Sequence, residues 1–250
     1  MSAIVVIPAR MASTRLPGKP LADIGGVPMI VRVWRQAVAA NVGAVVVAAA
    51  EREIATAIES AGGTACLTDP HLPSGSDRVF AALEKFDPQQ DHDVVVNLQG
   101  DLPALDPADV RAVVDALAAT GADIATLAAE IDDAADRDNP NVVKPVIVWD
   151  VSERRGRALY FSRAQVPAGD GPLFHHIGIY AFRRSALARF VKLAPSPLEK
   201  REKLEQLRAL EAGMTIAVAR VDAVPLSVDT PADLEKARAL LGRPQRSRHP

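Results

Sequence analysis

A loop that follows the first apolar run of the chain carries residue types that could bind phosphate. It extends from Pro8 to Pro20 and contains Arg10, Arg15 and Lys19 without a single acidic residue. Converging cations suit a polyphosphate, because each pair of opposite unit charges ~4 Å apart is worth about 4 kcal/mol at an effective dielectric constant of roughly 20. A solvated basic loop is the alternative. We favour phosphate binding because the loop follows a predicted buried strand, where α/β sheets bind ligands.

Two common phosphate-binding motifs do not account for this loop. Gly18 and Lys19 are followed by Pro20 instead of Ser or Thr, and no glycine stands five positions before Gly18, which excludes a Walker loop. No G-x-G-x-x-G sequence follows the first strand either. A Rossmann-type dehydrogenase is therefore disfavoured.

Two aspartates far apart in the sequence are candidates for a metal site. Asp101 follows a predicted strand that ends near Leu98, and Asp229 precedes a predicted helix. Each has a structural alternative, a turn residue for Asp101 and an N-cap at Asp229 or Thr230. If both carboxylates face a triphosphate, a hard divalent cation must offset their repulsion, and the predicted cofactor is Mg²⁺. His175 and His176 are adjacent and lack further ligands at metal-binding spacing.

Buried strands alternate with helical patterns along the first half of the chain. The predicted strands are 4–7, 44–47, 94–96 and 124–127, and the predicted helices are Met29–Ala40, Glu51–Ala61, Ser76–Phe86 and Pro107–Thr120. This series predicts an α/β fold with a doubly wound, mostly parallel sheet. Its ligand edge would carry both the cationic loop and Asp101.

The second half of the chain is more mixed. Strands are expected at 143–148, 177–182 and 215–221, and helices at 197–212 and 231–241. We expect one α/β domain over residues 1–241, with a small mixed α+β subregion over about 130–212. Residues 242–250, with Arg243, Arg246 and Arg248, are expected to form a flexible tail.

Composition excludes several protein classes. The 250 residues carry 29 Lys+Arg against 31 Asp+Glu, a formal net charge of −2, which argues against electrostatic binding of nucleic acid. The single cysteine, Cys66, fits a reducing cytosol and is predicted to be a buried, inert thiol. The longest apolar stretch, 42–50, is well short of the ~20 residues that span a bilayer. The first ten residues do not resemble a secretion signal, and we expect a cytoplasmic protein.

Several blocks of the sequence resemble one known family. The run Ile7–Leu21 resembles the signature of sugar-acid cytidylyltransferases. Later blocks are similar to one branch, the 3-deoxy-manno-octulosonate (Kdo) cytidylyltransferases, also called CMP-Kdo synthetases: Ser74–Arg78, Asn97–Asp101, Tyr160–Arg163, His176–Tyr180, Pro195–Glu199, Leu204–Arg208 and Val228–Pro231. The blocks occur in order along nearly the whole chain, from residue 4 to about 240.

The resemblance implies a nucleotide-sugar transferase fold, transfer of a cytidylyl group from CTP to Kdo with release of pyrophosphate, lipopolysaccharide biosynthesis, a Gram-negative source and a homodimer. It makes residues 1–241 a single nucleotidyltransferase domain, in which the subregion over about 130–212 binds the sugar acid and contributes to dimerisation. Carried over position by position, it implies nucleotide binding by Arg10, Ser13, Arg15, Lys19, Arg78 and Gln99, metal binding by Asp101 and Asp229, and sugar-acid binding by His176, Tyr180, Glu205 and Gln206. Arg10, Arg15, Lys19, Asp101 and Asp229 are the predicted catalytic set. No general base is assigned.

The chain departs from the family pattern at three places. Leu102 stands where the family often has Glu, His175 stands where Arg is common before the His-x-Gly block, and the stretch between Arg163 and His176 is short. Two other functions stay open. One is cytidylyl transfer to a related acceptor, such as sialic acid, 8-amino-Kdo or a molybdopterin, and the other is a non-catalytic nucleotide-binding regulator.

Overall fold

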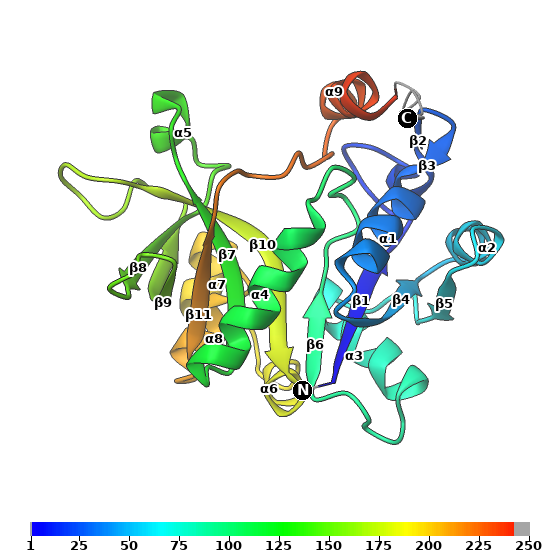
Figure 1. Cartoon of the computed structure of the whole chain (residues 1–250), viewed down its shortest axis with the longest axis horizontal. Coiled ribbons are helices and arrows are strands. Elements are labelled where there is room, and N and C mark those ends of the chain that lie inside the picture. The colour runs from blue at the N-terminus through cyan, green and yellow to red at the C-terminus, as the bar shows by residue number, and fades with distance from the viewer. Residues whose placement is uncertain (1, 243–250) are drawn as a thin grey trace, which may run out of the picture. The chain divides into compact units, whose positions relative to one another are not determined.

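Helices and strands are interleaved along the chain in a computed structural model that describes residues 2–242 (Figure 1). This order confirms the predicted α/β class. The chain divides into two compact units. Unit 1 contains the chain up to Ile4, Gln89–Asn97 and Ala108–Val224, and unit 2 contains Val5–Pro88, Leu98–Pro107 and the chain from Pro225 onward. The first strand, β1 (Ala3–Ala9), passes from one unit to the other.

Unit 2 contains the N-terminal strands in the order β5-β4-β1. Its elements are β1, the 3₁₀ helix η1 (Lys19–Leu21), the hairpin β2 (Asp23–Ile24) and β3 (Val27–Pro28), α1 (Met29–Ala40), β4 (Gly43–Ala49), α2 (Arg52–Ser60), β5 (Thr64–Leu67), α3 (Gly75–Phe86) and α9 (Pro231–Leu241). Strands β4 and β5 pair in parallel. The predicted helices 29–40 and 231–241 are confirmed to the residue.

A small core in unit 2 holds the C-terminal helix against the N-terminal hairpin. Buried side chains from the hairpin, α1 and α9 form it: Ile24, Met29, Val228, Leu234 and Ala237. Helix α9 lies beside β2 and β3 (Figure 1). Burial of each large aliphatic side chain is worth about 1.5–3 kcal/mol. This packing brings the segment before α9 back to the N-terminal part of the chain.

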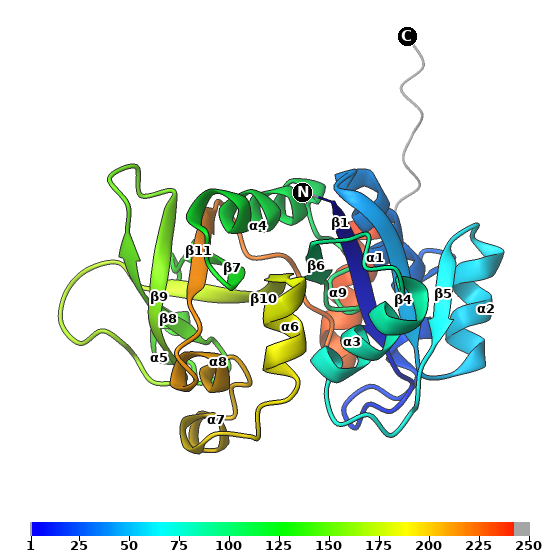
Figure 2. The same ribbon diagram turned by 90° about the horizontal axis from the view of Figure 1, so that it is seen from below.

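Unit 1 contains a mixed group of strands in the order β6-β10-β7-β11-β9-β8. Its elements are β6 (Val94–Asn97), α4 (Pro107–Thr120), β7 (Ile124–Glu130), α5 (Ala134–Asp138), β8 (Lys144–Trp149), β9 (Arg155–Ser162), β10 (Phe174–Arg183), α6 (Arg184–Phe190), α7 (Pro197–Glu202), α8 (Leu207–Glu211) and β11 (Ile216–Val221). Only β7 and β11 pair in parallel here, while β10 is antiparallel to both β6 and β7. Helix α4 lies on one side of these strands, and α6 and α8 lie on the other (Figure 2).

Two local predictions were wrong. A single helix over 197–212 was expected, but the segment forms two short helices, α7 and α8, because Lys203 adopts a left-handed conformation with φ 57°. Cys66 was expected to be buried, but it is only half-buried on β5, and burial raises the pKa of its thiol. Of the predicted tail, Gly242 caps α9, and residues 243–250 lie outside the described part of the chain.

Candidate functional site

The cationic loop of unit 2 is folded back on itself by backbone hydrogen bonds. The amide of Gly18 donates to the Met11 carbonyl at 3.3 Å, and the Met11 amide donates to the Glu51 carboxylate at 2.9 Å. Gly18 has φ 70°, a conformation that costs other residues roughly 1–2 kcal/mol. Because Gly18 turns the chain there, Lys19 begins η1 with a fixed direction.

Lys19 lies between the two aspartates that were predicted to hold a metal. Its Nζ is 2.7 Å from Oδ2 of Asp101 and 2.9 Å from Oδ1 of Asp229. Arg15 also contacts Asp229 Oδ1, at 3.1 Å. Three segments that are distant in sequence therefore converge on one point in unit 2.

Asp229 reaches this point because the start of α9 is capped by other residues. Thr230 and Asp233 form a capping box, in which the Thr230 hydroxyl accepts from the Asp233 amide and the Asp233 carboxylate accepts from the Thr230 amide. The Val228 amide donates to the Asp101 carbonyl at 3.0 Å, which aligns the two segments. Of the two predicted N-cap candidates, Thr230 is the cap. The Asp229 carboxylate is thereby left to meet Lys19 and Arg15.

The neighbouring carboxylates keep Lys19 protonated. Burial acts to lower the Lys19 pKa, but the Asp101 and Asp229 carboxylates outweigh it, and the pKa lies above its ordinary 10.5. The Lys19 side chain is 16% exposed, against 24% for Asp101 and 38% for Asp229. The ammonium is thus a permanent positive charge at neutral pH, in a place where water screens it only partly.

A cavity of about 690 Å³ opens beside this cluster, within unit 2. Its lining includes six of the predicted nucleotide-binding residues and one predicted metal ligand: Arg10, Ser13, Arg15, Lys19, Arg78, Gln99 and Asp101. Arg10 is exposed and makes no hydrogen bond or ion pair with any residue in the range 2–242. Its guanidinium is therefore available to a ligand in the cavity.

The N-terminus of α3 contributes to the same cavity. Ser74 caps this twelve-residue helix by accepting from the Asp77 amide, and both Ser74 and Gly75 line the cavity. The N-terminal end of a helix carries a partial positive charge and attracts anions. Gly100 allows close packing at the cavity wall, since a Cβ there would lie 3.0 Å from the Pro8 carbonyl oxygen.

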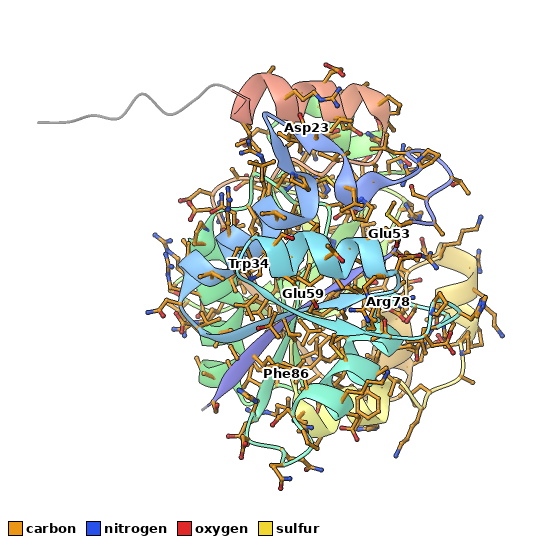
Figure 3. The ribbon with its side chains drawn as sticks, turned by 90° about the vertical axis from the view of Figure 1, so that its right-hand side faces the viewer. Asp23, Trp34, Glu53, Glu59, Arg78 and Phe86 are labelled. Carbon is orange, nitrogen blue, oxygen red and sulfur yellow. The ribbon has the colours of Figure 1, made fainter. Side chains whose placement is uncertain are left out.

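Arg78 lines the cavity but already uses part of its guanidinium within the protein. Arg78, labelled in Figure 3, belongs to α3. Its side chain donates to the Thr68 hydroxyl at 2.6 Å and to the Asp69 carbonyl at 2.9 Å. These bonds tie α3 to the loop after β5. Arg78 therefore orders this wall of the cavity, whatever contact it also makes with a ligand.

The two aspartates have the donor chemistry that Mg²⁺ uses. Magnesium is usually bound in proteins by one or two carboxylates together with substrate phosphates and water. In the described part of the chain, no three acidic, histidine or cysteine side chains gather into a complete protein metal site. Two carboxylates that converge on one point, beside a cavity lined by cations, thus fit an ion shared between protein and phosphate.

The predicted sugar-acid residues lie in unit 1. His176 and Tyr180 are on β10, with their ring centroids 5.6 Å apart, and the His176 ring lies edge-on to Phe161 at 5.0 Å. Burial lowers the pKa of His176 to about 3, so its imidazole is neutral at pH 7. Burial, followed by the charge of Glu205, raises the pKa of Tyr180. Both rings are thus uncharged at neutral pH and can exchange hydrogen bonds with a sugar.

Glu205 and Gln206 lie in the turn between α7 and α8, where a continuous helix was predicted. Gln206 is 6% exposed, and its buried Nε2 finds no hydrogen-bond partner among residues 2–242. A buried polar group without a partner costs roughly 1–3 kcal/mol, so such a group is expected to bind a ligand.

Two arginines brace this turn on either side. Arg163 donates from Nε to the Glu202 carbonyl at 2.9 Å, and its own amide donates to the Glu202 carboxylate at 3.0 Å. On the far side, Arg208 pairs with Glu199 through both carboxylate oxygens, and its guanidinium lies 5.3 Å from the centroid of the Phe190 ring. These supporting contacts had not been predicted from the sequence. The resemblance had included Arg163, Glu199 and Arg208 only as members of matching blocks.

Thr126, which contacts His176, is a supporting residue that the sequence could have indicated. It is fully buried in β7, and its hydroxyl contacts the His176 ring nitrogen Nε2 at 3.0 Å. A lone hydroxyl in an otherwise apolar buried strand is unusual, because buried polar groups need partners. That pattern could have identified Thr126, although not its partner.

The fold of each unit and the cationic cavity define a nucleotide-binding α/β transferase. Comparison with known proteins gives the same class. The family model described as Cytidylyltransferase matches residues 4–216. The chain is 68% identical over 240 residues to 3-deoxy-manno-octulosonate cytidylyltransferase from Parvibaculum lavamentivorans, covering 96% of this chain and 93% of the relative. It is 65% identical to the enzyme of the same name from Rhodospirillum rubrum, covering 96% and 95%.

A solved structure supports the same assignment. It is described as CMP:2-keto-3-deoxy-manno-octonic acid synthetase complexed with CTP, with a TM-score of 0.87, 39% identity and coverage of 96% of this chain and 98% of the other. The chain therefore belongs to the 3-deoxy-manno-octulosonate cytidylyltransferase family. A mycobacterial protein, a homologue of rv0371c, is similar at a TM-score of 0.62 but only 20% identity, which shows the fold alone.

Proposed function

We propose that this chain transfers the cytidylyl group of CTP to Kdo, releasing pyrophosphate and forming CMP-Kdo. The observation that carries the proposal is the convergence of Lys19, Asp101 and Asp229 beside a cavity lined by further cations. Relatives at 65–68% identity are named for this reaction, and a solved relative was obtained in complex with CTP.

In this proposal the anomeric hydroxyl of Kdo attacks the α-phosphorus of CTP in line with the leaving group. A phosphorus–oxygen bond to the sugar forms as the bond to pyrophosphate breaks. Arg15 and Lys19 hold the β- and γ-phosphates, and Arg10 offsets the charge that develops at the α-phosphate. Such a reaction proceeds through positioning and electrostatic stabilisation with little covalent chemistry from the protein.

Mg²⁺ is the proposed cofactor, with Asp101 and Asp229 as its protein ligands. When bound, the ion would supply neutralisation of phosphate charge. Lys19 now contacts both carboxylates, so we expect its ammonium to move to phosphate oxygens in the loaded enzyme. The convergence of these two carboxylates beside a cavity lined by cations supports this proposal.

His176, Tyr180, Glu205 and Gln206 are the proposed contacts of the sugar acid. The buried, unpartnered Nε2 of Gln206 supports this role, because it is a donor suited to a sugar or carboxylate oxygen. Arg78 and Gln99 are proposed to contact the nucleotide, as is Ser13, whose hydroxyl accepts from the Leu16 amide and keeps its own hydrogen for a ligand.

Three further proposals rest on the family resemblance. They are a role in lipopolysaccharide biosynthesis, a homodimeric assembly and a cytoplasmic location. In the structure, no helix of residues 2–242 combines the length and the apolar character needed to cross a membrane.

One assay tests the proposed function. Pyrophosphate release should be measured with CTP, UTP or ATP, each paired with Kdo, 8-amino-Kdo or sialic acid, with and without Mg²⁺. We expect the highest kcat/KM for CTP with Kdo, and only in the presence of Mg²⁺. Faster release with another acid would favour a sister transferase, and CTP binding without release for any pair would indicate a regulator.

A further inference from the structure

Strand β10 is interrupted at the point where the proposed sugar-acid residues stand. Its register against β7 shifts between Ile177 and Tyr180, so Gly178 and Ile179 fall outside the regular pairing. Such a bulge frees backbone carbonyls from their usual partners. The Thr126 hydroxyl, on β7, lies 3.1 Å from the Ile177 carbonyl oxygen and 2.9 Å from the Ile179 carbonyl oxygen.

The same hydroxyl meets a third group, the Nε2 atom of His176 at 3.0 Å. A threonine hydroxyl has one hydrogen to donate and lone pairs to accept with. The two carbonyl oxygens can only accept, so the hydroxyl hydrogen must be directed toward them. Thr126 Oγ1 can then bind His176 only as an acceptor, which requires a hydrogen on Nε2.

A neutral imidazole has a single N–H group. With the hydrogen on Nε2, the other nitrogen, Nδ1, has a lone pair and no hydrogen. Among residues 2–242 the His176 ring makes no hydrogen bond except the one to Thr126, and the residue is partly exposed. Nδ1 is therefore an acceptor without a protein donor.

We propose that Thr126 is a positioning residue that holds His176 as the Nε2–H tautomer, so that Nδ1 accepts a hydrogen bond from a hydroxyl of the sugar-acid substrate. This inference rests on the proposed function for its substrate. A carboxylate or phosphate oxygen has no hydrogen to give Nδ1 and would be repelled by its lone pair. His176 thus selects a hydroxyl of the acceptor and leaves its carboxylate to donor groups elsewhere.

The tautomer can be measured directly on the ligand-free, full-length protein. Long-range ¹H–¹⁵N correlation on ¹⁵N-histidine-labelled protein at neutral pH distinguishes a protonated from an unprotonated ring nitrogen. The His176 signals are assigned by their loss in His176→Gln. We expect a protonated Nε2 and an unprotonated Nδ1. A protonated Nδ1 would overturn the inference and leave the proposed function untouched.

Two substitutions separate positioning from simple packing. Thr126→Val is nearly isosteric and lacks the hydroxyl, and Thr126→Ser keeps it. We expect Thr126→Val to lose the single tautomer and to raise the KM for Kdo about three- to tenfold, the range for one neutral hydrogen bond, with the KM for CTP unchanged. Thr126→Ser should restore both the spectrum and the KM.

An unchanged KM for Kdo in Thr126→Val, or a serine variant that behaves like valine, would contradict the inference. If the valine variant does not fold, the wild-type spectrum and the serine variant still decide the tautomer. Failure of the proposed function would look different, since the wild-type spectrum would be as expected while no pyrophosphate is released with Kdo.

Discussion

At the scale of single residues, the main finding is the position of Lys19 between two acids that are 82 and 210 positions away in sequence. The sequence indicated that cations and acids belong to one site, because each follows a predicted strand or precedes a predicted helix. It did not indicate that the lysine would contact the acids themselves. That pairing lowers the cost of holding Asp101 and Asp229 close together when no ligand is bound.

Replacement of Lys19 should weaken nucleotide binding. Lys19→Met removes the ammonium while keeping much of the apolar stem, and we expect the KM for CTP to rise roughly 10- to 100-fold, the range for a charged hydrogen bond. Lys19→Arg, which keeps the charge, is the matched control and should lose less. The KM is measured by steady-state kinetics with varied CTP. A wild-type KM for CTP in Lys19→Met would contradict this role.

Gly100 gives a prediction about packing at the cavity wall. Its missing Cβ would lie 3.0 Å from the Pro8 carbonyl oxygen and 3.1 Å from Ile30 Cδ1, whereas a Cβ at Gly75 would lie 3.6 Å from Pro8 Cγ. We therefore expect Gly100→Ala to lower the free energy of unfolding by about 1–3 kcal/mol, as overpacking does. Gly75→Ala should not be destabilising. Equal urea midpoints for the two variants would contradict this prediction, because they would show that Pro8 and Ile30 can shift to make room for the added methyl group.

At the scale of elements, the break between α7 and α8 decides where Glu205 and Gln206 lie. The local sequence favoured one helix because its charged and apolar residues repeat with helical spacing. The turn is instead stabilised from a distance, since Arg163 donates to the carbonyls of Glu202 and Lys203 that a helix end leaves open. A contact across 40 positions cannot be read from local periodicity.

Lys203 provides a test of that break. It is exposed and adopts φ 57°, where glycine is favoured. Lys203→Gly should relieve about 1–2 kcal/mol of left-handed strain. Glycine loses more conformational entropy on folding, so the net rise in the free energy of unfolding should be about 0.5–1 kcal/mol. In the helical part of α7, Lys200→Gly should lower it by a similar amount. Chemical denaturation checks both, and destabilisation by Lys203→Gly would indicate a different backbone at this turn.

At the scale of the whole molecule, the sequence predicted an element correctly where neighbouring residues determine its structure. It failed where contacts with distant residues do. Helices with clear start and end residues, such as Met29–Ala40, were predicted to the residue. Strand β9, with the sequence RGRALYFS, was missed, since its identity depends on pairing with β8 and β11. For the site, the phosphate loop and the aspartates followed from residue types, whereas His176 and Gln206 followed only from resemblance.

The free energy of unfolding should fall in mild acid, and His176 should contribute to that fall. Burial, and then the charge of His175, lowers the pKa of His176 from 6.5 to about 3. Between these values the unfolded chain binds a proton that the folded chain does not, so the free energy of unfolding falls as pH decreases below about 6.5. The slope from this group can reach about 1.4 kcal/mol per pH unit.

His176→Gln removes the contribution of this histidine to the pH dependence, because glutamine can still donate to Thr126 but does not titrate. Denaturation between pH 7 and pH 5 should therefore show a weaker pH dependence in the variant than in the wild type. The same slope in both proteins would mean that His176 does not resist protonation in the fold.

Whether Asp101 and Asp229 bind the ion is tested most directly by the Mg²⁺ dependence of pyrophosphate release from CTP and Kdo. It should be compared in the wild type, Asp101→Asn and Asp229→Asn. If the two carboxylates bind the ion beside the cationic cavity, both variants should need at least about tenfold more Mg²⁺ for half-maximal rate, a loss that even supporting groups of a metal site produce. Wild-type Mg²⁺ dependence in both variants would show that neither carboxylate binds the ion.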